Sequence, residues 1–296
     1  MESFSGDGDL TFMSDGDPVG LGVYVRNLDR RFRARRTPQQ FAKRMKDHGF
    51  RNVWLQACWS DHRGHRESNR GQVRPYAEAC AAAGLTVGLW GFPSPVAIEP
   101  YFDSMVQRAS ECGGGVDKGG VIQSLLHDPE LPWKVKGGKH REVPMSMRGQ
   151  GEAIEGDGLI DSMEELNECA HRFMGADAIA RQEIGVPSVG NTSYGMAAWH
   201  PIPYEIFAQY GWQSPQLYSV TPSQVAKGIK QWRDLGAGYI VPSVPAFGKN
   251  SGPRLAAHLD AFVPHGIKGA IVWSSRQISA AELRTLQAFS ERHFEG

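Results

Sequence analysis

Closely spaced cysteines, net charge and long apolar runs are all missing from this chain of 296 residues. Its four cysteines, Cys58, Cys80, Cys112 and Cys169, form no C-x-x-C pair, so we expect buried, reduced thiols rather than disulfides or a zinc site. The 32 basic and 32 acidic side chains balance, which disfavours a dedicated nucleic-acid binder. No run approaches the roughly 20 apolar residues that span a bilayer, so no membrane partner is expected.

The first 18 residues are acidic and rich in glycine, and they lack the basic and apolar regions of a secretory signal peptide. We therefore expect synthesis in the cytoplasm. Because chain ends of this composition are usually loosely held, residues 1–18 are predicted to form a short acidic N-terminal arm. Such an arm is suited to docking on a larger assembly.

Apolar runs of strand length alternate with amphipathic segments along the rest of the chain. The strand-like runs lie at 19–27, 52–59, 85–93, 120–128, 185–195, 211–219, 237–247 and 268–277. The helix-like segments lie at 37–49, 74–84, 160–185, 221–238 and 279–294. This order is typical of parallel βαβ units, and eight such units close into a (β/α)₈ barrel of about 250 residues. We predict the α/β class, a single-domain TIM barrel over residues 19–296 with a long polar loop at 131–159 after strand four.

A doubly wound open sheet is the alternative fold. No G-x-G-x-x-G turn joins a strand to a helix and no G-K-[ST] phosphate loop exists, so no cofactor is expected. The segment "DHRGH" at 61–65 offers possible metal ligands, but it lacks a full shell, and we expect no metal.

Active sites of such barrels lie where the strands end, at the carboxyl side. Amides, carboxylates and aromatic side chains are enriched there in this sequence. They are Asn27, Asp61, Trp90, Asp128, Glu130, Asn191, Gln216, Tyr218 and Trp273. Aromatic faces stack on sugar rings while amides and acids bind hydroxyl groups, so the set suits a saccharide. Aromatic residues at strand ends are also common packing residues.

Two carboxylates follow the fourth strand, in "VIQSLLHDPELPW" at 121–133. Because alternate residues of a strand share a side, Leu126, Asp128 and Glu130 should all face the barrel axis. In a partly desolvated mouth Glu130 would have the raised pKa that a general acid needs, and Asp128 could stay ionised. By position alone, a chance pair of strand-end carboxylates explains the pattern equally well.

The motif "LLHDPE" resembles the D-x-E that ends the fourth strand in two families of barrel enzymes. These are glycoside hydrolase family 18 (chitinases and endo-N-acetylglucosaminidases) and the family 25 lysozyme-type muramidases. The segment "PQLYS" at 215–219 resembles the sixth-strand tyrosine motif of family 18, and "GAIVWSSRQ" at 269–277 resembles its eighth-strand segment. The segments "HDPELPW" and "YGWQSPQLY" are similar to family 25 segments of strands four and six.

The sequence departs from these patterns in two ways. Gln123 and Leu126 replace the first two acids of the family 18 motif D-x-x-D-x-D-x-E. Tyr24 occupies the place of the first-strand aspartate of family 25. Both departures favour a second hypothesis, a non-catalytic glycan-binding or structural barrel docked in a larger assembly.

The resemblance implies a glycosidase that cleaves β-1,4 linkages next to an N-acetylhexosamine, with Glu130 as proton donor. In family 18 the acetamido oxygen of the substrate is the nucleophile, so Asp128 would hold the acetamido group and Tyr218 would bind the forming ring. The sugar-binding residues would be Trp273, Trp90, Gln216, Asn191, Asn27 and Asp61. A family 25 mechanism would need a second carboxylate, for which Asp61 and Asp29 are candidates.

Peptidoglycan is the expected polysaccharide partner, ahead of a chitin-like one. The segment "RNLDRRFRARR" at 26–36 carries six arginines near the expected barrel mouth. It is either a solvated loop or an attractant for an anionic polymer such as peptidoglycan. Without a signal peptide, the protein could reach the cell wall by phage-type release or through delivery by an assembly.

Overall fold

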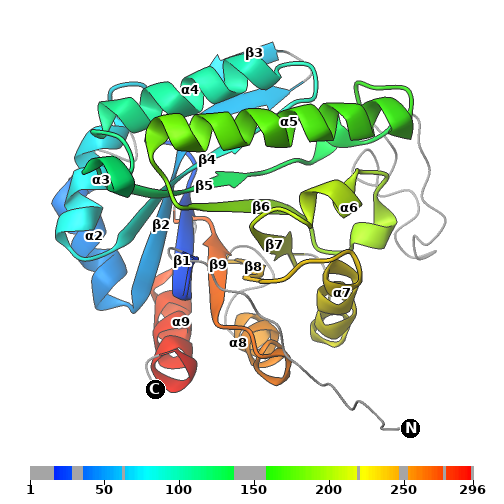
Figure 1. Cartoon of the computed structure of the whole chain (residues 1–296). Coiled ribbons are helices and arrows are strands. Elements are labelled where there is room, and N and C mark those ends of the chain that lie inside the picture. The colour runs from blue at the N-terminus through cyan, green and yellow to red at the C-terminus, as the bar shows by residue number, and fades with distance from the viewer. Residues whose placement is uncertain are drawn as a thin grey trace, which may run out of the picture.

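The computed structural model describes residues 17–28, 36–61, 64–136, 158–218, 221–246, 253–275 and 278–294. Eight parallel strands form a closed barrel in these ranges (Figure 1). They are β1 (Gly20–Val25), β2 (Phe50–Asp61), β4 (Thr86–Phe92), β5 (Ile122–His127), β6 (Ser188–Tyr194), β7 (Trp212–Gln216), β8 (Ser243–Pro245) and β9 (Gly269–Trp273). Because β1 pairs with both β2 and β9, the sheet has no open edge within the barrel. The predicted TIM barrel and all eight predicted strands are confirmed.

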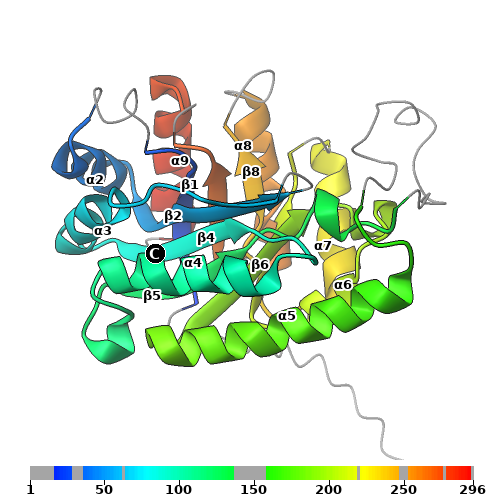
Figure 2. The ribbon, with the colours of Figure 1, turned by 90° about the horizontal axis from the view of Figure 1, so that it is seen from above.

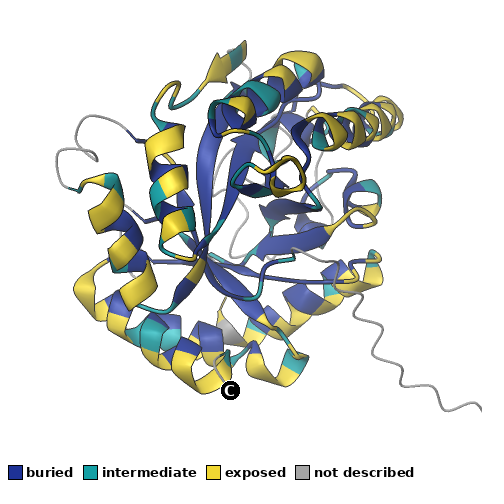
Figure 3. Ribbon diagram, turned by 60° about the vertical axis from the view of Figure 1, so that its left-hand side comes forward, coloured by how far each residue is buried: buried dark blue, intermediate teal, exposed yellow. Residues whose placement is uncertain are grey.

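Helices surround the strands on the outside, with exposed outer faces and buried inner faces (Figures 2 and 3). They are α2 (Pro38–Asp47), α3 (Val73–Ala82), α4 (Ile98–Glu111), α5 (Met163–Ile184), α6 (Tyr204–Phe207), α7 (Pro222–Asp234), α8 (Pro253–Asp260) and α9 (Ala280–His293). The five predicted helices are confirmed. Thr37 caps the start of α2, since its hydroxyl accepts the N–H of Gln40 at 3.2 Å.

Three α-helices and one strand of the described ranges were not predicted. Helix α4 begins without a side-chain cap, and α6 has only four residues, too few for a helical period to show. Helix α8 has eight residues, barely two turns. Strand β3 (Gly64–Glu67) folds back antiparallel on the end of β2, pairing Gly64 with Asp61. This hairpin extends the wall of the barrel beyond the parallel strands.

Large aromatic side chains fill the inside of the barrel. The interior cluster consists of Tyr24, Trp54, Trp90, Leu126, Trp212, Tyr239, Val241 and Ile271. Glycines make room for two of the indoles, because a Cβ on Gly88 would lie 2.4 Å from Trp54 and one on Gly190 would lie 2.3 Å from Trp212. The interior is therefore a packed core, and a ligand can enter only at the mouth.

The four cysteines are buried and free, as predicted. Burial raises the pKa of Cys80 to about 12, so this thiol stays protonated at neutral pH. In the part of the chain that the structure describes, no helix combines the length and the apolar character that a bilayer crossing needs.

The described end of the N-terminal arm lies at the amino side of the barrel, opposite the mouth. The Ser188 hydroxyl, at the start of β6, donates to the Asp17 carboxylate at 3.0 Å. Tyr239 donates to the carbonyl of Pro18 at 2.8 Å. Residues 1–16 of the predicted arm lie outside the described residues, as do 137–157 of the predicted loop.

Candidate active site

Backbone hydrogen bonds fix the two carboxylates that follow β5. The N–H of Asp128 donates to the carbonyl of Gly91 at 3.0 Å, and the N–H of Trp133 donates to the carbonyl of Glu130 at 2.9 Å. Between the two acids, the carbonyl of Pro129 accepts the Ser193 hydroxyl at 2.5 Å. Neighbouring β4 and β6 thus hold the segment from both sides, so its side chains have little freedom.

The carboxyls of Asp128 and Glu130 form a largely buried pair at the carboxyl end of the barrel, in which Asp128 is buried and Glu130 is half-buried. Asp128 is 5% exposed, and its Oδ1 accepts the side-chain amide of Gln216 at 2.8 Å. Burial raises the pKa of Asp128 well above its ordinary value, and the neighbouring Glu130 charge adds to the rise. Burial raises the pKa of Glu130 too. The two acids titrate as a unit and hold a proton to higher pH than an exposed acid would.

The pKa directions bear on the expectation that Asp128 stays ionised beside a protonated Glu130. Burial, with the neighbouring Glu130 charge, raises the pKa of Asp128 as well. The two coupled carboxyls therefore favour keeping a proton together.

Two cations, Arg26 and Lys134, moderate the cost of burying the pair. The charges of both lower the pKa of Glu130, against the larger effect of burial. Lys134 is fully buried, with Nζ 4.6 Å from the ring centroid of Tyr194. The other partner of that ring is His200, stacked at 3.8 Å. The sequence analysis did not single out Lys134, because one lysine in a polar loop carries no pattern.

Tyr218 and Trp273 lie at the mouth beside the pair, as the resemblance implies. Burial raises the pKa of Tyr218, and the nearby Tyr24, Asp128 and Glu130 raise it further. The ring centroid of Trp273 lies 6.5 Å from that of Tyr218 and 5.2 Å from that of Tyr24. The structure thus brings together five of the predicted site residues, namely Asp128, Glu130, Gln216, Tyr218 and Trp273.

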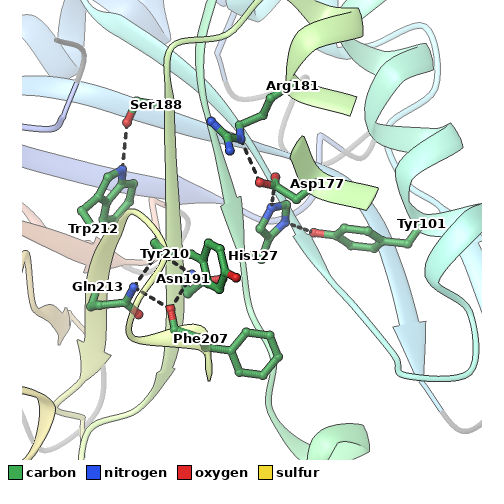
Figure 4. A network of polar contacts seen from close by, with 10 residues as sticks. All are labelled: Tyr101, His127, Asp177, Arg181, Ser188, Asn191, Phe207, Tyr210, Trp212 and Gln213. Carbon is green, nitrogen blue, oxygen red and sulfur yellow. Dashed lines mark hydrogen bonds and ion pairs between the residues drawn. The ribbon is translucent and has the colours of Figure 1, made fainter. Parts of the chain in front are cut away.

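Two other predicted residues lie away from the mouth. Trp90 is fully buried in the interior cluster, where its indole N–H donates to the carbonyl of Val25 at 3.2 Å. Asn191 points outward from β6, and its amide donates to the carbonyls of Phe207 and Tyr210 at 3.3 and 3.0 Å (Figure 4). Both are engaged in packing the protein itself, so we leave them out of the sugar-binding set.

Asn27 and Asp61 lie on the side of the mouth formed by β1, β2 and β3. Asn27 lines a pocket of about 230 Å³ there. Asp61 accepts the indole N–H of Trp59 at 3.0 Å and the guanidinium of Arg66 at 2.6 Å. Because Asp61 is held in this ion pair, it is a poor candidate for the second carboxylate. Asp29 lies outside the described residues.

A second buried polar cluster lies on the opposite face of β5. The Tyr101 hydroxyl and His127 Nδ1 are 2.8 Å apart, and His127 Nε2 lies 2.9 Å from Asp177 Oδ1 (Figure 4). Arg181 donates to the other oxygen of Asp177 at 2.8 Å. Burial acts to raise the pKa of Asp177, but the hydrogen bond and charge of His127, with those of Arg181, lower it overall. The cluster ties β5 to α4 and α5.

No group of three or more His, Cys, Asp or Glu side chains is placed to hold a metal ion within the described ranges. Of the histidines in "DHRGH", His65 is hydrogen-bonded through both ring nitrogens to Ser60 and Ser104, each at 2.7 Å. His62 lies outside the described residues.

Comparison with solved structures shows the barrel in other proteins, whereas no known family and no curated protein sequence matches the chain. A β-mannanase from the blue mussel Mytilus edulis superposes with a TM-score of 0.60 at 14% identity, over 93% of each chain. The C-terminal domain of a putative chitinase from Desulfitobacterium hafniense gives 0.61 at 8% identity, over 94% of this chain and 99% of that one. A broad-specificity endoglucanase from Clostridium longisporum gives 0.55 at 12% identity, over 95% and 99%. At such low identities, the similarity shows a shared TIM-barrel fold.

Proposed function

We propose that this protein is a glycoside hydrolase that cleaves β-1,4 linkages next to an N-acetylhexosamine, with Glu130 as the general acid. The observation that carries the proposal is the buried pair of Asp128 and Glu130, with Gln216, Tyr218 and Trp273 beside it. The names of the three similar structures are those of polysaccharide hydrolases, which supports a polysaccharide substrate.

The proposed reaction begins with proton transfer from Glu130 to the glycosidic oxygen. The raised pKa of the pair supports this step, because it keeps a proton available to higher pH than an exposed carboxyl would. The acetamido oxygen of the substrate attacks the anomeric carbon as the leaving group departs. Water then opens the cyclic intermediate, and Glu130 takes a proton from that water.

Other residues of the site would orient the sugar. Asp128 would bind the acetamido group, Tyr218 would hydrogen-bond near the forming ring, and Trp273 would stack beneath it. A nucleophile supplied by the substrate removes the need for a second carboxylate. This agrees with Asp61, which is held in an ion pair, and with Tyr24, which stands in place of a first-strand aspartate. The Tyr24 side chain packs in the interior cluster and hydrogen-bonds Ser243 at 3.1 Å, so the first strand offers no carboxylate there.

Peptidoglycan is the substrate that we favour, with chitin second. Peptidoglycan carries N-acetylhexosamines together with carboxylates, and six arginines lie between residues 26 and 36. Phage-type release, or delivery by a larger assembly that binds the N-terminal arm, would bring the protein to the cell wall.

A substrate panel tests the proposal. Purified protein is incubated with peptidoglycan sacculi, chitin oligosaccharides and β-mannan oligosaccharides, and new reducing ends are measured. We expect release from sacculi first, from chitin second and none from mannan. Cleavage of mannan alone would contradict an N-acetylhexosamine substrate. Binding without release on all three would instead support a non-catalytic glycan-binding barrel.

A further inference from the structure

A small pocket opens on the side of the mouth formed by β1, β2 and the β3 hairpin. Its volume is about 230 Å³, and its lining residues are Arg26, Asn27, Gln56, Trp59, Arg66, Glu67 and Ser68. This is below the range of about 300–1,000 Å³ that drug-sized ligands occupy, so the pocket suits one sugar ring or one ring substituent.

Aromatic stacking holds Arg26 at the boundary between the pocket and the buried pair. The guanidinium carbon lies 4.9 Å from the ring centroid of Trp59, which itself stacks on Phe92 at 4.1 Å. The charge of Arg26 also reaches the pair, where it lowers the pKa of both acids against the larger effect of burial. A stacked guanidinium keeps its edge donors available for a planar carboxylate.

The other charged residues that line the pocket are already paired. Arg66 bonds Asp61 at 2.6 Å, and Glu67 lies 3.2 Å from the fully buried Arg108 and 3.9 Å from Arg70. Arg26, in contrast, makes no ion pair with a carboxylate within the described ranges. Its side chain is exposed, so its guanidinium N–H groups can reach a ligand.

The wall of the pocket contains a buried acceptor with no partner among the residues that the structure describes. Gln56 is 2% exposed, and its Oε1 has no hydrogen bond in the described structure. An unsatisfied buried oxygen is costly, so a donor such as a sugar hydroxyl would stabilise it. The pocket therefore presents a cation for an anionic group, and a small shift of the Gln56 side chain in its wall would bring an acceptor to a hydroxyl.

We infer that this pocket is a subsite for a carboxylate-bearing sugar unit, with Arg26 binding the carboxylate and Gln56 accepting a hydroxyl. The assignment rests on the proposed function in that the adjacent Asp128 and Glu130 mark the point of cleavage. It narrows the substrate to a glycan in which an acidic residue lies next to the cleaved linkage.

Matched sugars test the inference without turnover. The full-length Glu130→Gln variant is titrated calorimetrically with N-acetylmuramic acid and N-acetylglucosamine, and with methyl β-glucuronide and methyl β-glucoside. We expect each acid to bind at least about 10-fold more tightly than its neutral partner, a difference of about 1.4 kcal/mol. Raising the salt concentration should weaken binding of the acids alone.

Two further substitutions in the same background locate the effect. Arg26→Gln should reduce the affinity for the acids about 10-fold and leave the neutral sugars unchanged, as expected for the loss of one charged hydrogen-bonding partner. Arg284→Gln, an exposed arginine on α9, should change neither.

Equal binding of acidic and neutral sugars, no measurable binding of the acids, or unchanged acid binding in Arg26→Gln would each overturn the inference. The binding results can be interpreted whether or not the protein is a glycosidase. Turnover of sacculi with Arg26-independent binding would refute the subsite alone. Arg26-dependent binding without turnover by the wild type would refute the glycosidase and leave the subsite standing.

Discussion

Acids in opposite electrostatic settings lie on the two sides of β5, Asp177 of α5 against His127 on one side and Asp128 with Glu130 on the other. On the outward face, the cluster of Tyr101, His127, Asp177 and Arg181 surrounds one carboxylate with a histidine and an arginine, and the pKa of Asp177 is lowered. On the inward face, Asp128 and Glu130 lie against each other and their pKa values are raised. The outward acid is stabilised as an anion, whereas the inward pair favours keeping a proton.

This difference separates a structural role from a chemical one. The Asp177 carboxylate lies against His127 and Arg181, and its cluster joins β5 to α4 and α5. This role needs no exchange of protons with solvent. A pair that keeps its proton at the open end of a packed barrel suits proton transfer. The difference between the two sites can be tested by substitution, beginning with the largest expected effect.

Asp177→Asn should cause the largest loss of stability. It leaves Arg181 and His127 without their buried anionic partner, and breaking such a buried pair typically costs about 3–5 kcal/mol. Urea unfolding at neutral pH measures the free energy of unfolding. Asp234→Asn is the matched control, because Asp234 is 59% exposed and pairs with Lys230 on the surface of α7. That control should change stability by less than about 1 kcal/mol. A loss of similar size in both variants would contradict the structural role of the outward cluster.

The two faces should also respond oppositely to pH. The folded-state pKa of Asp177 is lowered, so its contribution to stability is present above its unfolded pKa and is lost as the pH falls through the folded value. The folded-state pKa of Asp128 is raised, so its contribution is full at low pH and is lost as the pH rises through the folded value. Relative to wild type, Asp177→Asn should therefore lose more stability as the pH rises from the acid range. Asp128→Asn should gain relative stability over the same rise. Urea unfolding between about pH 2 and pH 8 measures both slopes, that of Asp177 below about pH 4 and that of Asp128 above it, and slopes of the same sign would refute the contrast.

Gln216→Leu should have the smallest effect, on the pH dependence of activity. The hydrogen bond from Gln216 lowers the pKa of Asp128 and of Glu130 against the effect of burial. Its removal should raise the pKa of the pair, so activity should persist to higher pH before the acid deprotonates. A pH–rate profile of reducing-end release measures the shift, with Gln287→Leu on α9 as the control. An unmoved high-pH limb would exclude the pair as the titrating acid.

The barrel and its carboxylate pair were predictable from the sequence because both follow from alternation. Apolar runs separated by helical segments give the order of strands, and the period of two places Leu126 and Asp128 on the side opposite His127. The structure confirms this arrangement, with Leu126 in the interior cluster and His127 in the outward one.

The depth and direction of side chains limited the prediction of the rest of the site. Trp90 was expected among the sugar-binding residues, but it is fully buried and Trp273 packs against it at 5.4 Å. Asn191 was also expected there, whereas it lies within β6 and its side chain points outward. The contributions of Arg26 and Lys134 depend on contacts with Trp59 and Tyr194 from distant strands. No local pattern encodes such contacts.

Glu130→Gln tests the central claim most directly, with turnover of peptidoglycan sacculi and the free energy of unfolding measured on the same preparations. Removing the general acid should lower the rate by about 10²–10⁴-fold. Stability at neutral pH should not fall, because burial disfavours the charged form of Glu130. Glu99→Gln, on a 73% exposed side chain at the start of α4, should leave both quantities unchanged. Turnover that survives Glu130→Gln, in a variant as stable as the wild type, would contradict the account.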